Sequence, residues 1–390
     1  MQHLRKVKDV PHRIEAYTAA LGIAINGNAP WDIQVHDNRL YRDLMRRGSL
    51  AFGEGFVNGW WSCDQLDVLF TRLLRTEQSI EVLQGFQVSA RIQSSLISIG
   101  ERLINWQSPM RALQVGRRHY DIDPRVYEAM LDSRKIYSCG YWENARSLEE
   151  AQEQKLRMIC EKLELKKGER LLDIGCGWGG LAAYAAEKYD VEVVGITVSS
   201  QQVRYAKEKT KGLPVKILLT DYRSELVGKE KLFDKVVSIG MIEHVGRRND
   251  KKFFSIAAKL LKEDGLMLVQ TIGTRKTNYQ VDPWIDTYIF PNGRLPSAKQ
   301  LCAGFEQDFK LEDWHSFGND YDKTLMAWWE NFDHAWTKLE EDIAPSFYRL
   351  WSYYLLSCAG LFRSGQGQLW QIVLSKPSRK QIYRSLRLNR

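Results

Sequence analysis

Acidic side chains follow two apolar runs of the chain, at positions where parallel strands would end. Asp221 follows the run 215–219, and Glu243 follows the run 233–240. A carboxylate at such a position can accept a hydrogen bond from a ligand or take a proton from it. Glu243 is therefore predicted to be a proton acceptor or an anchor for one, and an acid that favours a helix N-terminus is the alternative. The adjacent His244 is interpreted as a structural neighbour.

A glycine-rich turn at residues 175–180 follows a further apolar run, 171–174, and a helical pattern begins at Leu181. Glycine lets a ligand lie against the backbone and adopts positive φ without strain. The start of the helix offers backbone N–H groups that have no partner within the helix. The order of strand, turn and helix predicts the opening βα unit of a nucleotide-binding sheet.

The predicted nucleotide is S-adenosylmethionine rather than NAD. A dinucleotide fold would place an acid at the end of the second strand, about 20 residues after the turn, to bind a ribose. The strand predicted at 191–197 ends instead in Thr197, and the acid appears one strand later, as Asp221. Asp221 is placed to accept a hydrogen bond from an adenine amino group.

The elements that must position these residues alternate between strands and helices. Strands are predicted at 171–174, 191–197, 215–219, 233–240 and 265–272. Ser199 caps the helix after the second strand, and Ser147 with Glu150 forms a capping box that opens a long amphipathic helix. The alternation predicts an α/β fold with a mostly parallel sheet, in which ligands bind at the carboxyl ends of the strands.

The N-terminal region is predicted to be a separate domain, residues 1–85, that contacts lipid, a membrane or a dimer partner. Helices are predicted at 14–21 and 67–74 and a short strand at 31–36. The glycine- and aromatic-rich stretch 48–61 is interpreted as a turn packed on a tryptophan core, or as a surface that meets lipid or a partner. A helical linker is predicted at 86–118, and a catalytic domain with an acyl-chain pocket at 119–390.

Composition narrows the class of protein. A chain of 390 residues with 44% hydrophobic and 27% charged residues is typical of a globular protein of about two domains. No apolar run reaches the ~18–20 residues of a membrane span, and the N-terminus has no signal-peptide core. The six cysteines are scattered without a C-x-x-C pair, which predicts reduced thiols in the cytosol and neither a metal site nor a disulfide framework.

The formal net charge of +8 is concentrated at the C-terminal end. Residues 376–390 hold six basic side chains and no acid. A helical face that carries Lys380, Arg384 and Arg387 would suit an anionic membrane surface. A solvated, frayed terminus is the alternative. No recognition motif supports a nucleic acid as partner.

Several longer motifs resemble those of the bacterial cyclopropane fatty acid synthases. Three of them are Tyr-Ser-Cys-Gly-Tyr-Trp at 137–142, the glycine turn with its strand at 172–180, and Glu-His-Val-Gly at 243–246. The other motifs are residues 284–293, residues 314–321, and residues 53–61 in the N-terminal domain. The resemblance covers nearly the whole chain, and the N-terminal domain marks the type that modifies phospholipids. It implies a class I, Rossmann-like methyltransferase fold with helices on both faces of the sheet and a smaller N-terminal α+β domain.

The resemblance also implies a reaction. S-adenosylmethionine alkylates the cis double bond of an acyl chain in a membrane phospholipid, which creates a carbocation. Loss of a proton from the new methyl group then closes a cyclopropane ring. Aromatic faces stabilise cations, and the candidates implied are Tyr137, Tyr141, Trp142, Tyr288 and Tyr321. A bound bicarbonate ion is implied as the proton acceptor.

The residues that the resemblance implies for the bicarbonate pocket are the backbone N–H of Cys139, Glu243, the backbone of Ile272, and Tyr321. The remaining family position is usually His and is Gln270 here. An amide can hydrogen-bond to bicarbonate, but it cannot carry a proton as imidazole does. Cys358 matches a family cysteine considered for the active site, and the alternative is a small residue in an apolar helix.

The resemblance implies the following S-adenosylmethionine site: Tyr137, Ser138, Asp173, Gly175, Cys176, Gly177, Gly179, Thr197, Ser199, Gln202, Asp221 and Tyr222. It further implies transient binding to a phospholipid bilayer, a cytoplasmic protein at the inner membrane surface, and a homodimer. Two alternatives remain open. One is a class I methyltransferase that acts on a lipid amine or hydroxyl, and the other is a non-catalytic lipid-binding relative, for which Gln270 is the only hint.

Overall fold

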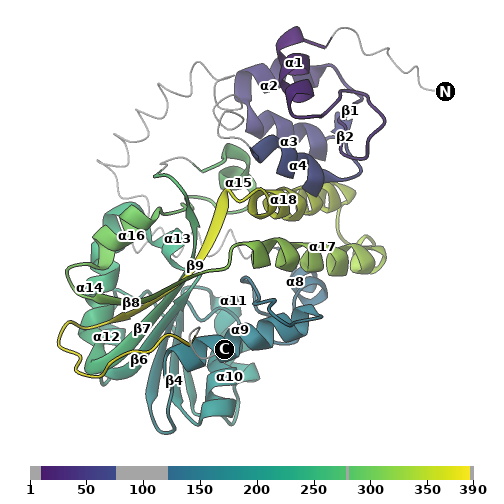
Figure 1. Cartoon of the computed structure of the whole chain (residues 1–390). Helices are drawn as coiled ribbons and strands as arrows, with labels where there is room; N and C mark the ends of the chain where they lie inside the picture. Colours follow the sequence, from purple (N-terminus) through teal and green to yellow (C-terminus); the bar gives the residue numbers. More distant parts are fainter. Residues whose placement is uncertain (1–9, 76–121, 278–280, 387–390) are drawn as a thin grey trace. The chain divides into compact units, whose positions relative to one another are not determined.

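The computed structural model describes residues 10–75, 122–277 and 281–386, which belong to two compact units (Figure 1). Of the described residues, 10–75, 281–291 and 321–367 form one unit, and 122–277, 292–320 and 368–386 form the other. The linker predicted at 86–118 lies outside the described residues. The range 119–390, predicted as one catalytic domain, contributes to both units because the helix at 345–363 packs on the helix at 66–74.

The second unit is built on a seven-stranded sheet with the order β5-β4-β3-β6-β7-β9-β8. The strands are β3 Arg170–Ile174, β4 Glu192–Thr197, β5 Val215–Leu219, β6 Phe233–Ile239, β7 Leu261–Thr274, β8 Lys310–Ser316 and β9 Gly367–Ser375. β3 pairs in parallel with β4 and β6, β4 with β5, and β6 with β7, whereas β8 and β9 are antiparallel. The five predicted strands are confirmed. β8 and β9 were not predicted.

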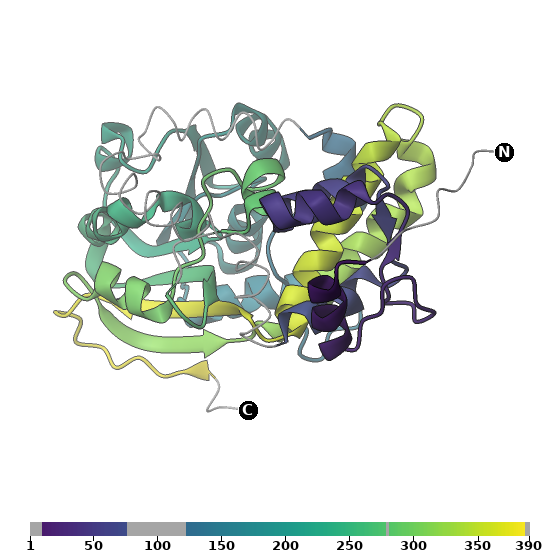
Figure 2. The same cartoon turned by 90° about the horizontal axis from the view of Figure 1, so that it is seen from above.

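Helices cover both faces of this sheet (Figures 1 and 2). They are α8 Pro124–Met130, α9 Leu148–Lys162, α10 Gly180–Tyr189, α11 Ser200–Lys209, α12 Glu225–Gly228, α13 Ile242–Val245, α14 Asp250–Leu260 and α16 Ala298–Phe305, with a 3₁₀ turn at Arg247–Asn249. Successive strand residues point to opposite faces. Leu172 therefore packs in one core with residues of α14 and α16, and Leu171 packs in the other with residues of α9 and α10.

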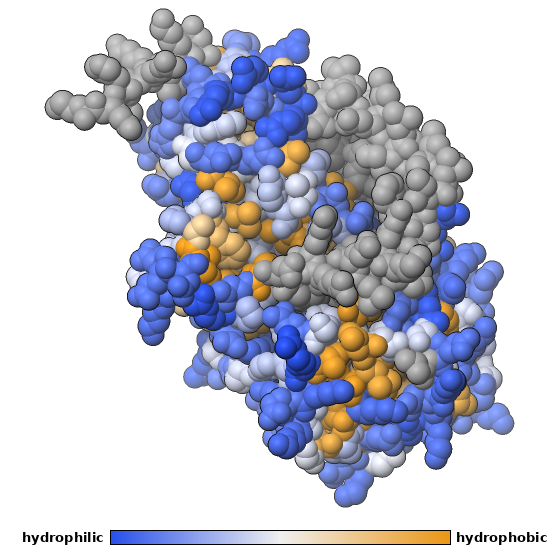
Figure 3. Space-filling view, turned by 180° about the vertical axis from the view of Figure 1, so that it is seen from behind, coloured by the Kyte–Doolittle hydropathy of each residue, from blue (hydrophilic) through white to orange (hydrophobic). Residues whose placement is uncertain are grey.

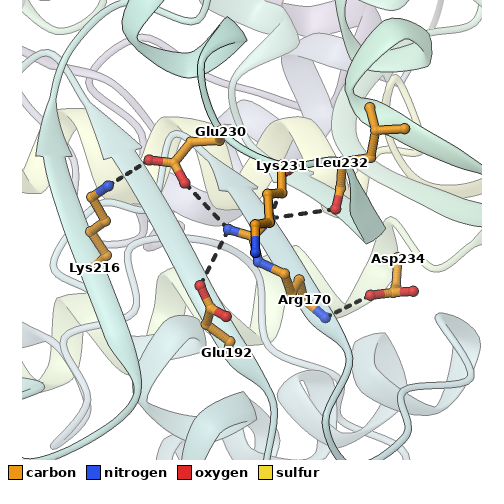
Figure 4. Close-up of polar contacts among 7 residues, drawn as sticks. All are labelled: Arg170, Glu192, Lys216, Glu230, Lys231, Leu232 and Asp234. Atoms are coloured by element: carbon orange, nitrogen blue, oxygen red, sulfur yellow. Dashed lines mark hydrogen bonds and ion pairs between the residues drawn. The ribbon is translucent and has the colours of Figure 1, made fainter.

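Arg170 joins the amino ends of β3, β4 and β6 (Figure 4). Its Nη2 lies 3.2 Å from carboxylate oxygens of both Glu192 and Glu230. Its Nη1 donates to the carbonyl oxygen of Lys231 at 2.6 Å, and its backbone N–H donates to Asp234 at 2.9 Å. This cluster lies at the edge opposite the carboxyl ends of the strands. It links β3 to β4 and β6 and takes no part in the edge of the sheet at which ligands are expected to bind.

The first unit combines N-terminal helices with helices from the second half of the chain. Its elements are α1 His12–Ala20, α2 Arg39–Arg47, α3 Ser49–Val57, α4 Leu66–Leu74, α15 Pro283–Tyr288, α17 Asn319–Leu339, α18 Pro345–Arg363, and the antiparallel pair β1 Gln34–Val35 and β2 Trp61–Ser62. The helices predicted at 14–21 and 67–74 are confirmed as α1 and α4. The strand predicted at 31–36 is reduced to two residues.

Most of the stretch 48–61, predicted to be a turn, forms the helix α3, so this prediction is wrong. Gly53, within the helix, serves close packing rather than a turn, because a Cβ added there would lie 2.3 Å from the Trp284 ring. The tryptophan core is confirmed, since Trp61 is fully buried and stacks on Phe52 with ring centroids 4.1 Å apart.

The basic helix predicted near the C-terminus is also wrong for the part that the structure describes, because residues 376–385 form a turn, a bend and irregular backbone. Two of the cations pair with acids of the same unit. Lys376 Nζ lies 2.9 Å from Glu263 Oε1, and the buried Arg379 donates to Glu164 Oε2 at 2.9 Å. These pairs hold the segment against the sheet domain.

Hydrophilic residues cover most of the face shown in Figure 3, and hydrophobic residues gather in separate patches. Within residues 10–75, 122–277 and 281–386, no helix has the length and apolar character of a membrane span. The same residues contain no group of three or more His, Cys, Asp or Glu side chains that could hold a metal ion. The six cysteines all lie in described segments and form no disulfide.

Candidate active site

The glycine turn follows β3, where the strand order reverses between β3 and β6. Gly175, Gly177 and Gly179 have φ values of +86°, +53° and +81°, which side chains with a Cβ seldom adopt. A Cβ added at Gly177 would meet no atom within 4 Å, so the backbone there borders open space. The turn therefore fits a ligand that lies directly against the backbone, as the predicted S-adenosylmethionine would.

Polar residues after β4 form a buried cluster beside this turn. Thr197 Oγ1 donates to Gln202 Oε1 at 2.6 Å, and Ser199 caps α11 by accepting from the Gln202 N–H at 3.3 Å. Asp221, after β5, accepts from the guanidinium of Arg223 at 2.7 and 2.8 Å. A carboxylate has about four acceptor sites, so Asp221 can still accept from an adenine amino group. The adjacent Tyr222 is a core residue.

A cavity of about 350 Å³ lies next to the turn. Its lining residues are Pro124, Tyr127, Glu128, Lys135, Trp178, Gln201, Arg204 and Tyr205. It shares only Trp178 with the glycine turn. The Lys135 ammonium lies 4.0 Å from the Tyr205 ring centroid and 2.7 Å from Glu128, so its charge is already balanced.

A buried lysine supports the segment 137–142. Lys155 Nζ on α9 donates to Ser138 Oγ at 2.9 Å, and Gln152 Nε2 donates to the Ser138 carbonyl at 2.8 Å. Burial lowers the pKa of Lys155 to about 8 and raises the pKa of the nearby Asp173 to about 7. The two groups stabilise each other's charged form against this effect of burial. The hydrogen bonds from Lys155 and Gln152 hold Ser138 in place, which pre-organises a residue predicted to contact the cofactor.

Lys155→Met should raise the KM for S-adenosylmethionine about tenfold with a smaller change in kcat, because a hydrogen bond from a charged donor contributes ~1.5–3 kcal/mol. Steady-state kinetics and calorimetric titration of the cofactor measure this. Lys235→Met is the matched control, since Lys235 is also buried but pairs with Glu169 at the amino end of β6. Unchanged cofactor affinity in Lys155→Met would show that Ser138 is placed without it.

Glu243 lies in α13, directly after β6, and is 7% exposed. Its Oε1 accepts the backbone N–H of Ile272 at 2.7 Å, and the backbone N–H of Arg294 donates to its carbonyl at 2.9 Å. Its Oε2 is buried without a hydrogen-bond partner among the described residues. Burial raises the pKa of Glu243 to about 7. The unpartnered Oε2 could accept a hydrogen bond from the hydroxyl of a bicarbonate ion. The Ile272 N–H was expected to bind that ion, but in the structure it donates to Glu243 Oε1.

Two other residues predicted near this carboxylate, Gln270 and Cys139, are also buried. Gln270 on β7 is 2% exposed, and its Oε1 accepts from Gln371 Nε2 at 2.9 Å. Cys139 is fully buried, and its Sγ lies 3.1 Å from the Gly140 carbonyl oxygen, so its thiol is directed at the backbone. Burial lowers the pKa of His244 to about 4, so its imidazole is neutral at pH 7.

Three further predicted residues, Tyr288, Tyr321 and Cys358, belong to the first unit and are described within it. Tyr321 stacks on Phe362 with ring centroids 4.5 Å apart, and Tyr288 donates to Glu54 at 3.0 Å. Cys358 lies in α18, where burial raises the pKa of its thiol to about 12. A thiol with this pKa is protonated at neutral pH, which favours the packing interpretation over a nucleophile.

The structure adds three polar residues that sequence reasoning missed: Lys155, Lys162 and Gln371. Lys155 and Lys162 lie seven residues apart on the buried face of α9, where a charged residue is unusual. That position on an apolar helical face was the available signal. Gln371 interrupts the apolar run of β9, a strand that was not predicted.

The family model for mycolic acid cyclopropane synthetase matches residues 107–372. The cyclopropane-fatty-acyl-phospholipid synthase of Escherichia coli strain K12 is 48% identical over 355 residues, which cover 91% of this chain and 90% of that protein. The chain belongs to the cyclopropane synthetase family. Membership confirms the resemblance found in the motifs and makes the chain an S-adenosylmethionine-dependent methyltransferase.

Solved structures of the family show the same fold. The cyclopropane synthase MmaA2 from Mycobacterium tuberculosis is 30% identical with a TM-score of 0.63, over 68% of this chain and 98% of that chain. The mycolic acid cyclopropane synthase CmaA1, complexed with SAH and CTAB, is 31% identical with a TM-score of 0.62, over the same shares of the two chains. The predicted class I methyltransferase fold is thereby confirmed.

Proposed function

We propose that this cyclopropane synthetase family member transfers a methylene group from S-adenosylmethionine to the cis double bond of unsaturated acyl chains in membrane phospholipids. The observation that carries the proposal is the unpartnered, buried Oε2 of Glu243, which follows the strand next to the glycine turn. An enzyme that alkylates carbon must remove a proton from carbon afterwards, and a buried acceptor beside the cofactor turn meets that need. The chain is similar over 91% of its length to a protein that is named for this reaction, and this similarity supports the proposal.

The chain's own residues have separate tasks in this reaction. When bound, S-adenosylmethionine supplies an electrophilic methyl group, and the glycine turn with Ser138 holds it. When bound, bicarbonate supplies a base, and Glu243 Oε2 holds it by accepting its hydroxyl hydrogen. Buried aromatic residues such as Tyr141, which is 7% exposed, keep water from the cationic intermediate on the acyl chain.

The proposed substrate requires contact with a bilayer, which we place on the cytoplasmic side of the inner membrane. Lys380 and Arg384 are exposed, and Ile382 between them is 84% exposed. An apolar side chain flanked by cations suits the surface of an anionic membrane. This irregular segment takes the place of the basic helix that the sequence indicated.

Reversing both charges, Lys380→Glu with Arg384→Glu, should weaken binding to vesicles that contain phosphatidylglycerol by about tenfold or more, at roughly 1 kcal/mol per cation. Sedimentation with vesicles at low ionic strength measures this. Lys207→Glu with Lys211→Glu, two exposed lysines elsewhere, should have a smaller effect. Equal losses in both variants would mean that net charge, and not this segment, governs binding.

The function is tested by incubating the purified chain with methyl-labelled S-adenosylmethionine and vesicles of phospholipids with cis-unsaturated acyl chains. Mass spectrometry should find a methylene group added to the acyl chains. Label in the headgroup would instead identify a methyltransferase that acts on an amine or hydroxyl. Cofactor binding without turnover would identify a non-catalytic relative.

A further inference from the structure

A chain of buried hydrogen bonds leads from the core of the second unit to Gln270. Lys162 Nζ, at the end of α9, donates to Gln371 Oε1 at 2.8 Å. Gln371 Nε2 then donates to Gln270 Oε1 at 2.9 Å. The three residues are 1%, 0% and 2% exposed, respectively. Water therefore does not compete for these groups, and each bond is stronger than its counterpart on the surface.

The ammonium of Lys162 fixes the direction of every bond in this chain. A lysine ammonium has donors and no acceptor, so the Gln371 atom that faces it must be the amide oxygen. Gln371 therefore donates from its NH₂ group to Gln270, and the side-chain oxygen of Gln270 accepts this hydrogen bond. The NH₂ group of Gln270 is left on the other side, where no described residue accepts from it. This polarity follows from chemistry alone and does not depend on how an amide is assigned.

Two further groups hold the ammonium in place. His315 Nδ1 lies 2.9 Å from Lys162 Nζ, and Asp313 Oδ2 lies 3.8 Å from it. His315 must accept with Nδ1, which places its ring proton on Nε2. Asp313 is buried and balances the charge of the ammonium. Both come from β8, in which His315 pairs with Gln371 across the strands.

Gln270 lies beside Glu243 in this arrangement. The backbone carbonyl oxygen of Gln270 accepts the backbone N–H of Gly240 at 2.9 Å. Gly240 follows β6 and lies three residues before Glu243. Two residues after Gln270, the N–H of Ile272 donates to the Glu243 carboxylate. An NH₂ group directed away from Gln371 at this position is a donor available to the anion that Glu243 would hold.

We infer that Lys162 and Gln371 are positioning residues that lock the Gln270 carboxamide with its NH₂ group toward the proposed anion site. Gln270 then binds the anion as a fixed hydrogen-bond donor and takes no part in proton transfer. This inference rests on the proposed function, because the anion is the bicarbonate named there. It assigns a purpose to the residue at which this chain departs from the family pattern.

Gln371→Glu tests the inference because it replaces the NH₂ group by a carboxylate oxygen of the same size. The new carboxylate still accepts from Lys162, but Gln270 must now turn its NH₂ group toward residue 371 and its oxygen toward the anion. The bicarbonate concentration that gives half of the rise in Tm, with sodium chloride as the reference salt, should increase about tenfold or more. Calorimetric affinity for S-adenosylmethionine should stay within about twofold, since neither residue lies at the glycine turn.

Gln270→Leu and the double variant complete a cycle that separates positioning from a general structural role. Gln270→Leu should weaken bicarbonate binding by a similar factor, and Gln371→Glu should add almost nothing to it, because the amide that it turns is gone. If Gln371→Glu does not fold, Gln371→Met replaces it in the cycle. Wild-type bicarbonate affinity in the Gln371 variant, or full additivity in the double variant, would overturn the inference and leave the proposed function intact. A wild-type chain that forms the ring without binding bicarbonate would overturn the inference together with the anion site.

Discussion

Replacing Glu243 by glutamine should lower the rate of ring formation by about 100-fold or more, the usual contribution of a group that assists proton transfer. Glutamine keeps the size of the side chain, and its amide oxygen can still accept the N–H of Ile272. It presents an NH₂ group where the carboxylate presents Oε2, so it no longer accepts a hydrogen from the anion. Single-turnover formation of the cyclopropane product, with saturating S-adenosylmethionine, measures the loss. A rate near that of the wild type would contradict the role of Glu243.

The same substitution should stabilise the chain at high pH. Burial raises the pKa of Glu243 from 4.5 to about 7, so the folded state binds this proton more tightly than the unfolded state does. Below about pH 4.5 both states are protonated and the carboxyl costs nothing. The chain loses stability as the pH rises from about 4.5 to about 7, and above pH 7 the buried charge costs about 3 kcal/mol. Glu243→Gln should recover up to that amount at pH 8 and nothing at pH 4.

Urea unfolding in bicarbonate-free buffer at the two pH values checks this. Glu225→Gln, at an exposed position in α12, is the control and should change the free energy of unfolding at neither pH. A Glu243→Gln variant that is less stable than the wild type at pH 8 would mean that the groups that favour its ionised carboxylate, the Ile272 N–H, Thr271 and Arg294, outweigh the cost of burial.

Replacing Gly177 by alanine should weaken S-adenosylmethionine binding about tenfold or more and leave the fold intact. The added Cβ would project into open space in the structure, so it meets the ligand and not the protein. The positive φ costs ~1–2 kcal/mol for alanine. Gly168→Ala is a matched control, because Gly168 has φ +80°, also faces open space, and precedes β3 at the opposite edge of the sheet.

Equilibrium titration of the cofactor and urea unfolding of both variants give the comparison. The two variants should lose similar stability, but only Gly177→Ala should lose cofactor affinity. If both keep wild-type affinity, the ligand does not lie against Gly177, and the glycine turn has a purely structural role.

Local patterns were sufficient for the parallel half of the sheet. The apolar run 171–174 is followed by a glycine turn that ends the strand, and Ser199 marks the start of α11 by capping it. These signals come from residues close together in the sequence, where steric and capping effects act directly. They placed Asp221 and Glu243 at strand ends before any tertiary contact was known.

Long-range packing explains what the sequence did not show. The stretch 48–61 has the composition of a turn, but Gly53 lies in a helix and admits the ring of Trp284 against it, and no local pattern reveals that contact. The C-terminal cations predict a basic helix, but residues 376–385 form no helix, and Arg379 among them is buried against Glu164. From the sequence, Gln270 was recognised only as a departure from the usual histidine. The orientation of its side-chain amide depends on a hydrogen bond from Gln371, about 100 residues away.

Addition of the methyl group to carbon is tested most directly with S-adenosylmethionine that carries a trideuterated methyl group. The chain, incubated with vesicles of cis-unsaturated phospholipid, should yield acyl chains that gain a CD₂ group, because one deuteron leaves when the ring closes. Nuclear magnetic resonance should show the cyclopropane ring in the same acyl chains. Retention of an intact CD₃ group on the headgroup, or on an acyl chain without a ring, would contradict cyclopropane formation by this chain.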